Sequence, residues 1–211
     1  MAAQAVLDRA FAAPEISFLL LDAKGGLLAQ RWPEGIQTPI SPGSLVKPWL
    51  AIAYGEQHHG EYPTIQCRGT QSHCWYPRGH GQLALQKALA DSCNAYFLQL
   101  AAGLDRERAR LTLAQYNLRG PDLHAPDTAL VGLGNEWKET PLHLARAYLA
   151  LAGERGQPMQ SMILRGMTES ASGGTAKALG NALGKDMVFA KTGTASVANG
   201  VLSILSFGAA V

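Results

Sequence analysis

Apolar residues form short runs near both ends of the chain and longer, helix-length stretches between them. Residues 16–22 and 27–32 are two such runs, and the turn between them contains a lysine followed by two glycines, which is a pattern typical of a β-hairpin. A second hairpin is predicted near the C-terminus, with strands at 187–196 and 201–207 and a turn at 198–200. Strands are therefore expected at both ends of the chain.

Between these hairpins, apolar residues recur at helical spacing and are interrupted by capping residues, prolines and glycines. Helices are predicted at residues 2–12, 44–54, 83–90, 95–104, 105–119, 142–152 and 174–183. This order predicts an α+β fold, in which one antiparallel sheet from about 14–32 and 186–208 accompanies a helical region at about 44–184. With 211 residues, the chain is expected to form a single domain over 1–211.

Composition mainly excludes other classes of protein. Hydrophobic residues make up 47% of the chain and charged residues 16%, which favours a folded core over disorder. The formal net charge is only +2 and no basic run is present, so nucleic acid is not an expected partner. No apolar run reaches membrane-spanning length, and the N-terminus lacks the pattern of a signal peptide.

Three short motifs carry the candidate chemistry, and the first is Ser44-Leu45-Val46-Lys47. Residues three apart on a helix share a face, so Lys47 could accept the proton of a nucleophilic Ser44. Burial would lower the pKa of this lysine and supply its neutral form. Pro48 fits the first helical turn, where its missing N–H costs no hydrogen bond. The alternative interpretation is a serine N-cap followed by a surface lysine.

The other two motifs combine hydroxyl, amide and ammonium groups, and they are Ser92-Cys93-Asn94 and Lys191-Thr192-Gly193-Thr194. The second motif lies between two predicted helices, where its hydroxyl suits proton relay and its amide suits peptide binding, although both residue types also cap helices. The third lies on a predicted strand, where its lysine and hydroxyls suit a carboxylate and its glycine would let a substrate backbone approach. An edge strand with a protective lysine is the alternative there. Together the three motifs favour covalent acyl transfer at a serine.

The chain resembles the transpeptidase domain of class B penicillin-binding proteins, within the serine β-lactamase and penicillin-recognising superfamily. The likeness extends beyond the motifs to segments at 43–48, 79–81, 88–97, 140–148 and 173–176. It implies a peptidoglycan D,D-transpeptidase that acts on D-Ala-D-Ala stem peptides and is acylated by penicillin and other β-lactams. The alternatives are a D,D-carboxypeptidase or β-lactamase-type hydrolase, and a non-catalytic scaffold that binds cell-wall assembly proteins.

The resemblance also implies a role for each motif residue. Ser44 would be the nucleophile, Lys47 its general base, Ser92 the proton relay to the leaving group, and Asn94 the holder of the acyl side chain. The oxyanion hole would be formed by the backbone N–H groups of Ser44 and Thr194. The terminal carboxylate of the substrate would bind along the third motif, at Lys191, Thr192, Gly193 and Thr194. This chemistry requires no cofactor, and the resemblance implies a periplasmic or cell-envelope location.

A structural zinc site is a further candidate, because all three cysteines fall between residues 67 and 93. With one histidine they supply the ligand types of a closed tetrahedral site, at Cys67, Cys74, His80 and Cys93. Some elongation-type class B members similarly carry a zinc near the second motif, and His80 and Cys93 match ligand positions there. The alternatives are His73 in place of His80, a Cys67–Cys74 disulfide with Cys93 as a buried free thiol, and three inert thiols.

The resemblance gives two further expectations. Family members continue after the last predicted strand with a central strand and a helix, so the N-terminal hairpin either pairs with residues 201–207 or leaves an edge open. Glu136 and Glu139 are expected to be solvated, which leaves no glutamate placed to activate a deacylating water. Independently of the resemblance, three of the four tryptophans are expected either in the core or along a groove, namely Trp49, Trp75 and Trp137.

Overall fold

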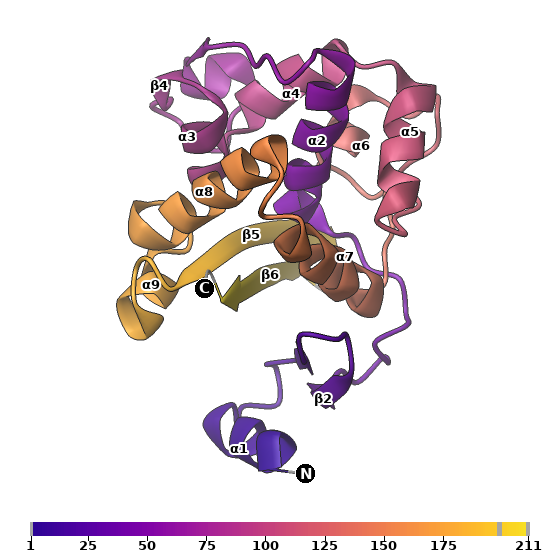
Figure 1. Ribbon diagram of the computed structural model, residues 1–211, viewed down its shortest axis with the longest axis vertical. Helices are drawn as coiled ribbons and strands as arrows, with labels where there is room; N and C mark the ends of the chain where they lie inside the picture. The colour runs from indigo at the N-terminus through magenta and orange to yellow at the C-terminus, as the bar shows by residue number, and fades with distance from the viewer. Residues whose placement is uncertain (1, 198–199, 210–211) are drawn as a thin grey trace.

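The computed structural model describes residues 2–197 and 200–209, and it shows a mixed arrangement of helices and antiparallel strands (Figure 1). The helices are α1 (Ala2–Ala10), η1 (Gly43–Val46), α2 (Lys47–Gln57), η2 (Gly69–Ser72), α3 (Leu85–Ala90), α4 (Asn94–Ala102), α5 (Arg106–Gln115), α6 (Asp127–Leu130), α7 (Pro141–Gly153), α8 (Pro158–Gly173) and α9 (Lys177–Leu183). The strands are β1 (Phe18–Leu21), β2 (Leu27–Arg31), β3 (Ile65–Cys67), β4 (Gly81–Leu83), β5 (Val188–Val197) and β6 (Gly200–Ala209). The α+β class predicted from the sequence is confirmed.

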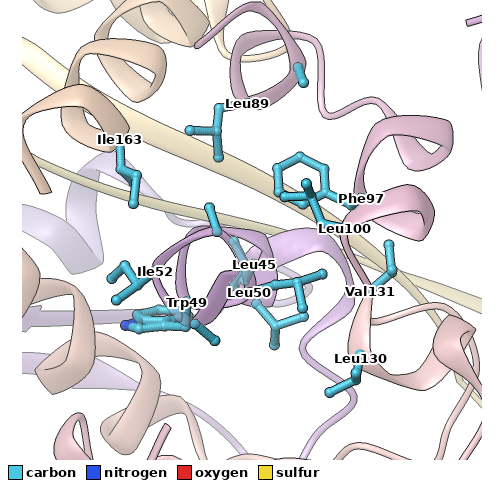
Figure 2. Close-up of a cluster of buried hydrophobic side chains, with 14 of the residues drawn as sticks. Leu45, Trp49, Leu50, Ile52, Leu89, Phe97, Leu100, Leu130, Val131 and Ile163 are labelled. Atoms are coloured by element: carbon cyan, nitrogen blue, oxygen red, sulfur yellow. The ribbon is translucent and has the colours of Figure 1, made fainter. Parts of the chain in front are cut away.

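Helix α2 is the centre of the core, and it is buried on nearly all sides as its apolar sequence predicts. Figure 2 shows its side chains, with those of η1, surrounded by residues from α3, α4, α6 and α8. Trp49, Ile52, Phe97 and Ile163 are all fully buried in this cluster. Because α2 follows directly from η1, the core fixes the segment that carries the first motif.

Helix α8 was not predicted, although it is the longest helix in the part of the chain that the structure describes. Its sequence contains an internal glycine, Gly166, which lowers helix propensity. The structure explains this glycine by packing: a Cβ there would lie 2.9 Å from Gln86 O and 3.0 Å from Leu89 Cβ on α3. The contact between α8 and α3 therefore overrides the local preference.

The strands form three separate antiparallel pairs among the described residues: β1–β2, β3–β4 and β5–β6. The expectation that the N-terminal hairpin and the C-terminal strands build one sheet is therefore wrong, and the edge of β6 that does not face β5 carries no strand from residues 2–197. Instead, the turn of the β1–β2 hairpin lies against α7, where a Cβ at Gly25 would be 3.6 Å from Leu149 Cδ2. Figure 1 shows α1 and this hairpin at one end of the molecule, away from β5. The predicted turn at Ala198 and Asn199 lies outside the described residues.

Two smaller findings complete the fold. The segment 60–81, expected to be a loop, contains η2 and strand β3, and it ends at the first residue of β4, with which β3 pairs. Within the described ranges, none of the helices has the length and apolar character needed to cross a membrane.

Candidate active site

Ser44 lies in η1, a 3₁₀ turn, and Lys47 is the first residue of α2. In 3₁₀ geometry residues three apart eclipse each other, so the turn places both side chains on one face. Ser44 is partly exposed, whereas Leu45, Val46 and Lys47 are buried. Pro48 occupies the first turn of α2, as predicted, and it leaves this turn without one amide donor.

The buried Tyr148 of α7 supplies a hydrogen bond to this turn. Its hydroxyl donates to the Leu45 carbonyl over 2.7 Å, and its ring packs edge-on against Trp49 with centroids 4.6 Å apart. Burial raises the pKa of Tyr148 well above its ordinary value, so the hydroxyl keeps the proton that it donates. The sequence gives no local signal for this contact, because Tyr148 and Leu45 are far apart in the chain.

The turn packs closely against β5. Gly43 has a left-handed φ of 57°, and a Cβ there would lie 2.5 Å from Thr194 O and 2.9 Å from Thr194 N. A Cβ on Gly193 would lie 2.9 Å from Pro42 O. The absence of a Cβ at Gly193 therefore lets the turn that carries Ser44 approach the strand, a contact that was not predicted. The turn that carries Ser44 consequently lies directly against the backbone of Thr194.

The second motif forms the connection between α3 and α4. Ser92 adopts a left-handed conformation with φ of 52°, and Asn94 begins α4. Backbone hydrogen bonds from Ser92 N to Leu89 O (3.2 Å) and from Cys93 N to Ala88 O (2.9 Å) close this turn. The arrangement directs both Ser92 and Asn94 toward Lys47.

A buried polar network joins the three motifs. The Lys47 ammonium donates to Ser92 O at 2.8 Å, to Ser92 Oγ at 3.3 Å and to Asn94 Oδ1 at 2.7 Å. Lys191 Nζ donates to the same Ser92 Oγ at 2.8 Å and to Thr192 O at 2.9 Å. The Ser92 hydroxyl therefore lies between two lysines that are both fully buried. Among the described residues, neither lysine has a hydrogen bond to Ser44 Oγ.

Burial shifts the charge state of both lysines. Loss of hydration lowers the pKa of Lys47 to about 7, although Coulomb interactions with Cys93 and Cys74 partly oppose the shift. Burial and the nearby Lys47 lower the pKa of Lys191 well below its ordinary value. A substantial neutral fraction of Lys47 is therefore present near neutral pH, and a neutral amine can accept a proton.

The third motif extends along β5 from this network. Thr192 Oγ1 donates to Thr175 Oγ1 over 2.7 Å, and Thr175 Oγ1 in turn donates to Ala90 O over 3.4 Å. Thr194 is exposed, whereas Lys191 and Gly193 are buried. The link from Thr192 through Thr175 to the end of α3 was not predicted, since nothing local in the sequence shows that these segments meet.

Glu139 differs from the prediction. It is only 1% exposed, and its carboxylate accepts hydrogen bonds from Arg119 N and from Trp137 Nε1. Its buried position follows from the bridge between residues 40 and 139, which joins the loop before α7 to the segment before η1. Glu136 is exposed, as expected. Within residues 2–197 and 200–209, no carboxylate forms a hydrogen bond with Ser44, Lys47 or Ser92.

The four predicted metal ligands cluster beside the second motif. One donor atom from each of Cys67, Cys74, His80 and Cys93 lies within 4.8 Å of the others. Cys67 Sγ and Cys74 Sγ are 3.6 Å and 3.5 Å from His80 Nδ1, and Cys74 Sγ is 3.8 Å from Cys93 Sγ. All three cysteines are free thiols, so the alternative disulfide is not formed, and the exposed His73 is outside the cluster.

These separations can be compared with tetrahedral zinc. Zinc–sulfur bonds of about 2.3 Å and zinc–nitrogen bonds of about 2.0 Å place two sulfurs about 3.8 Å apart, and a sulfur and a nitrogen about 3.5 Å apart. The two sulfur–nitrogen distances to His80 Nδ1 and the sulfur–sulfur distance between Cys74 and Cys93 match these values. Burial also lowers the pKa of His80, against the opposing charge of Asp91, which favours the neutral imidazole that binds metals. The residues present therefore fit a zinc ion.

The fold and the three joined motifs define the class of protein. The chain has the β-lactamase-like fold of penicillin-recognising proteins. The family model described as the penicillin binding protein transpeptidase domain matches residues 17–203. The chain therefore belongs to the penicillin-binding protein transpeptidase domain family.

Individual relatives agree with this assignment. The chain is 28% identical over 167 residues to the peptidoglycan D,D-transpeptidase MrdA of Salmonella typhimurium, an alignment that covers 63% of this chain and 26% of that protein. The crystal structure of Pseudomonas aeruginosa PBP2 in complex with WCK 5153 has a TM-score of 0.81 at 19% identity, covering 98% of this chain and 68% of that one. PBP2 of Helicobacter pylori in complex with MreC has a TM-score of 0.76 at 18% identity, covering 94% and 54%. The chain thus spans about a quarter of the length of its curated relative.

Proposed function

We propose that the chain is the acylating domain of a peptidoglycan D,D-transpeptidase, with Ser44 as its nucleophile. The observation that supports this most is the buried network in which Lys47, Ser92, Asn94 and Lys191 meet beside the Ser44 turn. A lysine with a pKa of about 7 is suited to act as a general base. Family membership supports the same activity, which the MrdA relative carries in its name.

In the proposed reaction, Ser44 Oγ attacks the carbonyl carbon between the two D-alanines of a stem peptide, and its proton passes to the neutral Lys47 amine. The backbone N–H groups of Ser44 and Thr194 stabilise the negative oxygen that forms. Collapse of this intermediate breaks the C–N bond, and the leaving D-alanine amine takes a proton that returns from Lys47 through Ser92 Oγ. The acyl group then stays on Ser44 as an ester until an acceptor amine replaces it.

The other motif residues bind the substrate. Lys191, Thr192 and Thr194 form the carboxylate site along β5, and Gly193 brings this strand against the Ser44 turn. The Oδ1 atom of Asn94 accepts from Lys47, which leaves its Nδ2 amide to bind the acyl side of the substrate.

Transfer is favoured over hydrolysis because, among the described residues, no carboxylate forms a hydrogen bond with Ser44, Lys47 or Ser92 that would place it to activate a water there; Glu139 Oε1 instead accepts from Arg119 N and Trp137 Nε1. The test is the fate of a D-Ala-D-Ala peptide incubated with the protein and an acceptor amine. Release of D-alanine with formation of the new amide, both lost in Ser44→Ala, is the expected result. Release of D-alanine with free acid as the main product would instead support a D,D-carboxypeptidase.

Location and partners follow from the same proposal. The substrate is peptidoglycan, so the chain would act in the periplasm or elsewhere in the cell envelope, and β-lactams would acylate it as substrate analogues. One neighbour was solved with MreC and another belongs to a peptidoglycan synthase complex. We therefore propose that this chain also works with cell-wall assembly proteins.

We further propose that Cys67, Cys74, His80 and Cys93 hold a structural zinc. When bound, zinc would supply four-coordinate cross-linking of segments 67–80 and 93, and the catalytic steps would not require it. Purified protein is expected to contain about one zinc per chain by elemental mass spectrometry. The His80→Ala variant should lose this zinc and unfold at a lower temperature, whereas His73→Ala, the matched control, should retain both properties. Equal zinc content in the two variants would contradict the site.

A further inference from the structure

Trp75 is placed unlike two of the other tryptophans in the chain. Trp49 and Trp137 are buried, whereas Trp75 is 53% exposed. Its ring has contacts with Tyr76 and His80, at centroid distances of 5.8 Å and 5.6 Å, on the same short loop. Burial of apolar surface therefore does not account for its position.

The indole N–H of Trp75 explains the position instead. Nε1 donates to two successive backbone carbonyls of the second motif region, Asp91 O at 3.2 Å and Ser92 O at 3.1 Å. The Ser92 carbonyl also accepts from Lys47 Nζ at 2.8 Å. A carbonyl oxygen has two lone pairs, so Trp75 and Lys47 can bind it together.

The turn that these donors hold is strained. Ser92 has a left-handed φ of 52°, a conformation that a residue with a Cβ adopts only when its surroundings enforce it. Its amide is held by Leu89 O, while its carbonyl is held by Trp75 and Lys47. In this conformation Ser92 Oγ lies between Lys47 Nζ and Lys191 Nζ.

We propose that Trp75 is a positioning residue for Ser92: its indole N–H clamps the strained turn that presents the Ser92 hydroxyl to the two buried lysines. The catalytic consequence rests on the proposed function, whereas the clamp itself does not. Neighbouring side chains support the same alignment, because Cys74 precedes Trp75, Cys93 follows Ser92, and their sulfurs are 3.8 Å apart. The loop at 74–76 and the turn at 91–93 are thus in contact at adjacent positions.

The first test is the kinetics of acylation by a fluorescent penicillin. Trp75→Phe keeps an aromatic ring and removes the N–H, and replacement of Trp75 by benzothienylalanine keeps the whole shape with sulfur in place of N–H. Both changes are expected to slow the acylation step about tenfold, the effect of losing one to two hydrogen bonds. The dissociation constant of the preceding non-covalent complex should stay within about twofold, because the binding residues are unchanged. Tyr76→Phe is the matched control, since its hydroxyl has no hydrogen bond among the described residues.

The second test requires no reaction. Amide hydrogen exchange of a peptide covering residues 88–94 should become about tenfold faster in both Trp75 variants and stay unchanged in Tyr76→Phe, because the turn opens more often. Unchanged exchange would overturn the inference, and so would weaker penicillin binding with an unchanged acylation rate. If the unmodified protein is not acylated at all, the proposed function fails, and the exchange result alone decides the role of Trp75.

Discussion

The pH dependence of acylation follows from the burial of Lys47. Its pKa is lowered from 10.5 to about 7, chiefly because the ammonium loses its hydration in the core. At pH 7 this shift raises the neutral fraction from about 1 in 3000 to about one half, a gain of roughly a thousandfold in the form that can accept a proton. The rate of acylation should therefore depend on pH in a range where an ordinary lysine would show no change.

Acylation should become slower as pH falls, because the reactive form of Lys47 is the neutral amine and protonation removes it. Below pH 7 the rate of acylation by a β-lactam should fall about tenfold per pH unit, and above about pH 8 it should level off. Lys47→Arg, which stays charged, should lose about a thousandfold or more of the rate at pH 8. The exposed Lys185→Arg is the matched control and should keep the unmodified profile.

The assay is stopped-flow acylation with a fluorescent penicillin between pH 5.5 and pH 9, with circular dichroism at each pH to confirm folding. A rate independent of pH over this range would refute the assignment of Lys47 as the base. An inflection that persists in Lys47→Arg would refute it equally, because another group would then be titrating.

Two further predictions concern the turn that carries Ser44. Gly43→Ala should destabilise the protein by about 3 kcal/mol or more in urea unfolding, because the new Cβ meets the Thr194 backbone. Gly60→Ala is the control, because Gly60 has a similar left-handed φ but open space around it, and it should cost only about 1 kcal/mol. Equal losses of stability in the two variants would contradict the packing argument. Tyr148→Phe should lower the free energy of unfolding by about 1–2 kcal/mol and slow acylation, because the Leu45 carbonyl loses a buried donor. A variant that is as stable and is acylated as fast as the original protein would show that this hydrogen bond does not hold the turn.

The parts of the fold that the sequence predicts are those with local signals. Pro48 marks the start of α2, and Thr140 with Pro141 marks the start of α7, since a capping hydroxyl and a proline act within one turn. Helix α8 lacks such agreement among its local signals. Gly166 disfavours a helix locally, and the packing of α8 on α3 is what requires a glycine there. Short-range signals therefore identify elements whose causes are local and miss those whose causes are tertiary.

The candidate site shows the same division. The residue types at the three motifs indicate acyl transfer. The hydrogen bonds from Lys47 and Lys191 to Ser92 Oγ, however, join residues that are far apart in the chain. Glu139 reads as a solvated loop residue because its polar partners, Arg119 N among them, come from other segments. Trp75 is a similar case, since its role lies in its N–H, which ordinary hydrophobic patterns do not distinguish.

The most direct test of the central claim is intact mass spectrometry of the purified chain after incubation with penicillin, alongside the Ser44→Ala variant. The account predicts that one molecule of penicillin adds to the unmodified chain, that peptide mapping places it on Ser44, and that the variant, shown to be folded, gains no mass. A folded, unmodified chain that gains no mass, or an adduct that persists in Ser44→Ala, would contradict it.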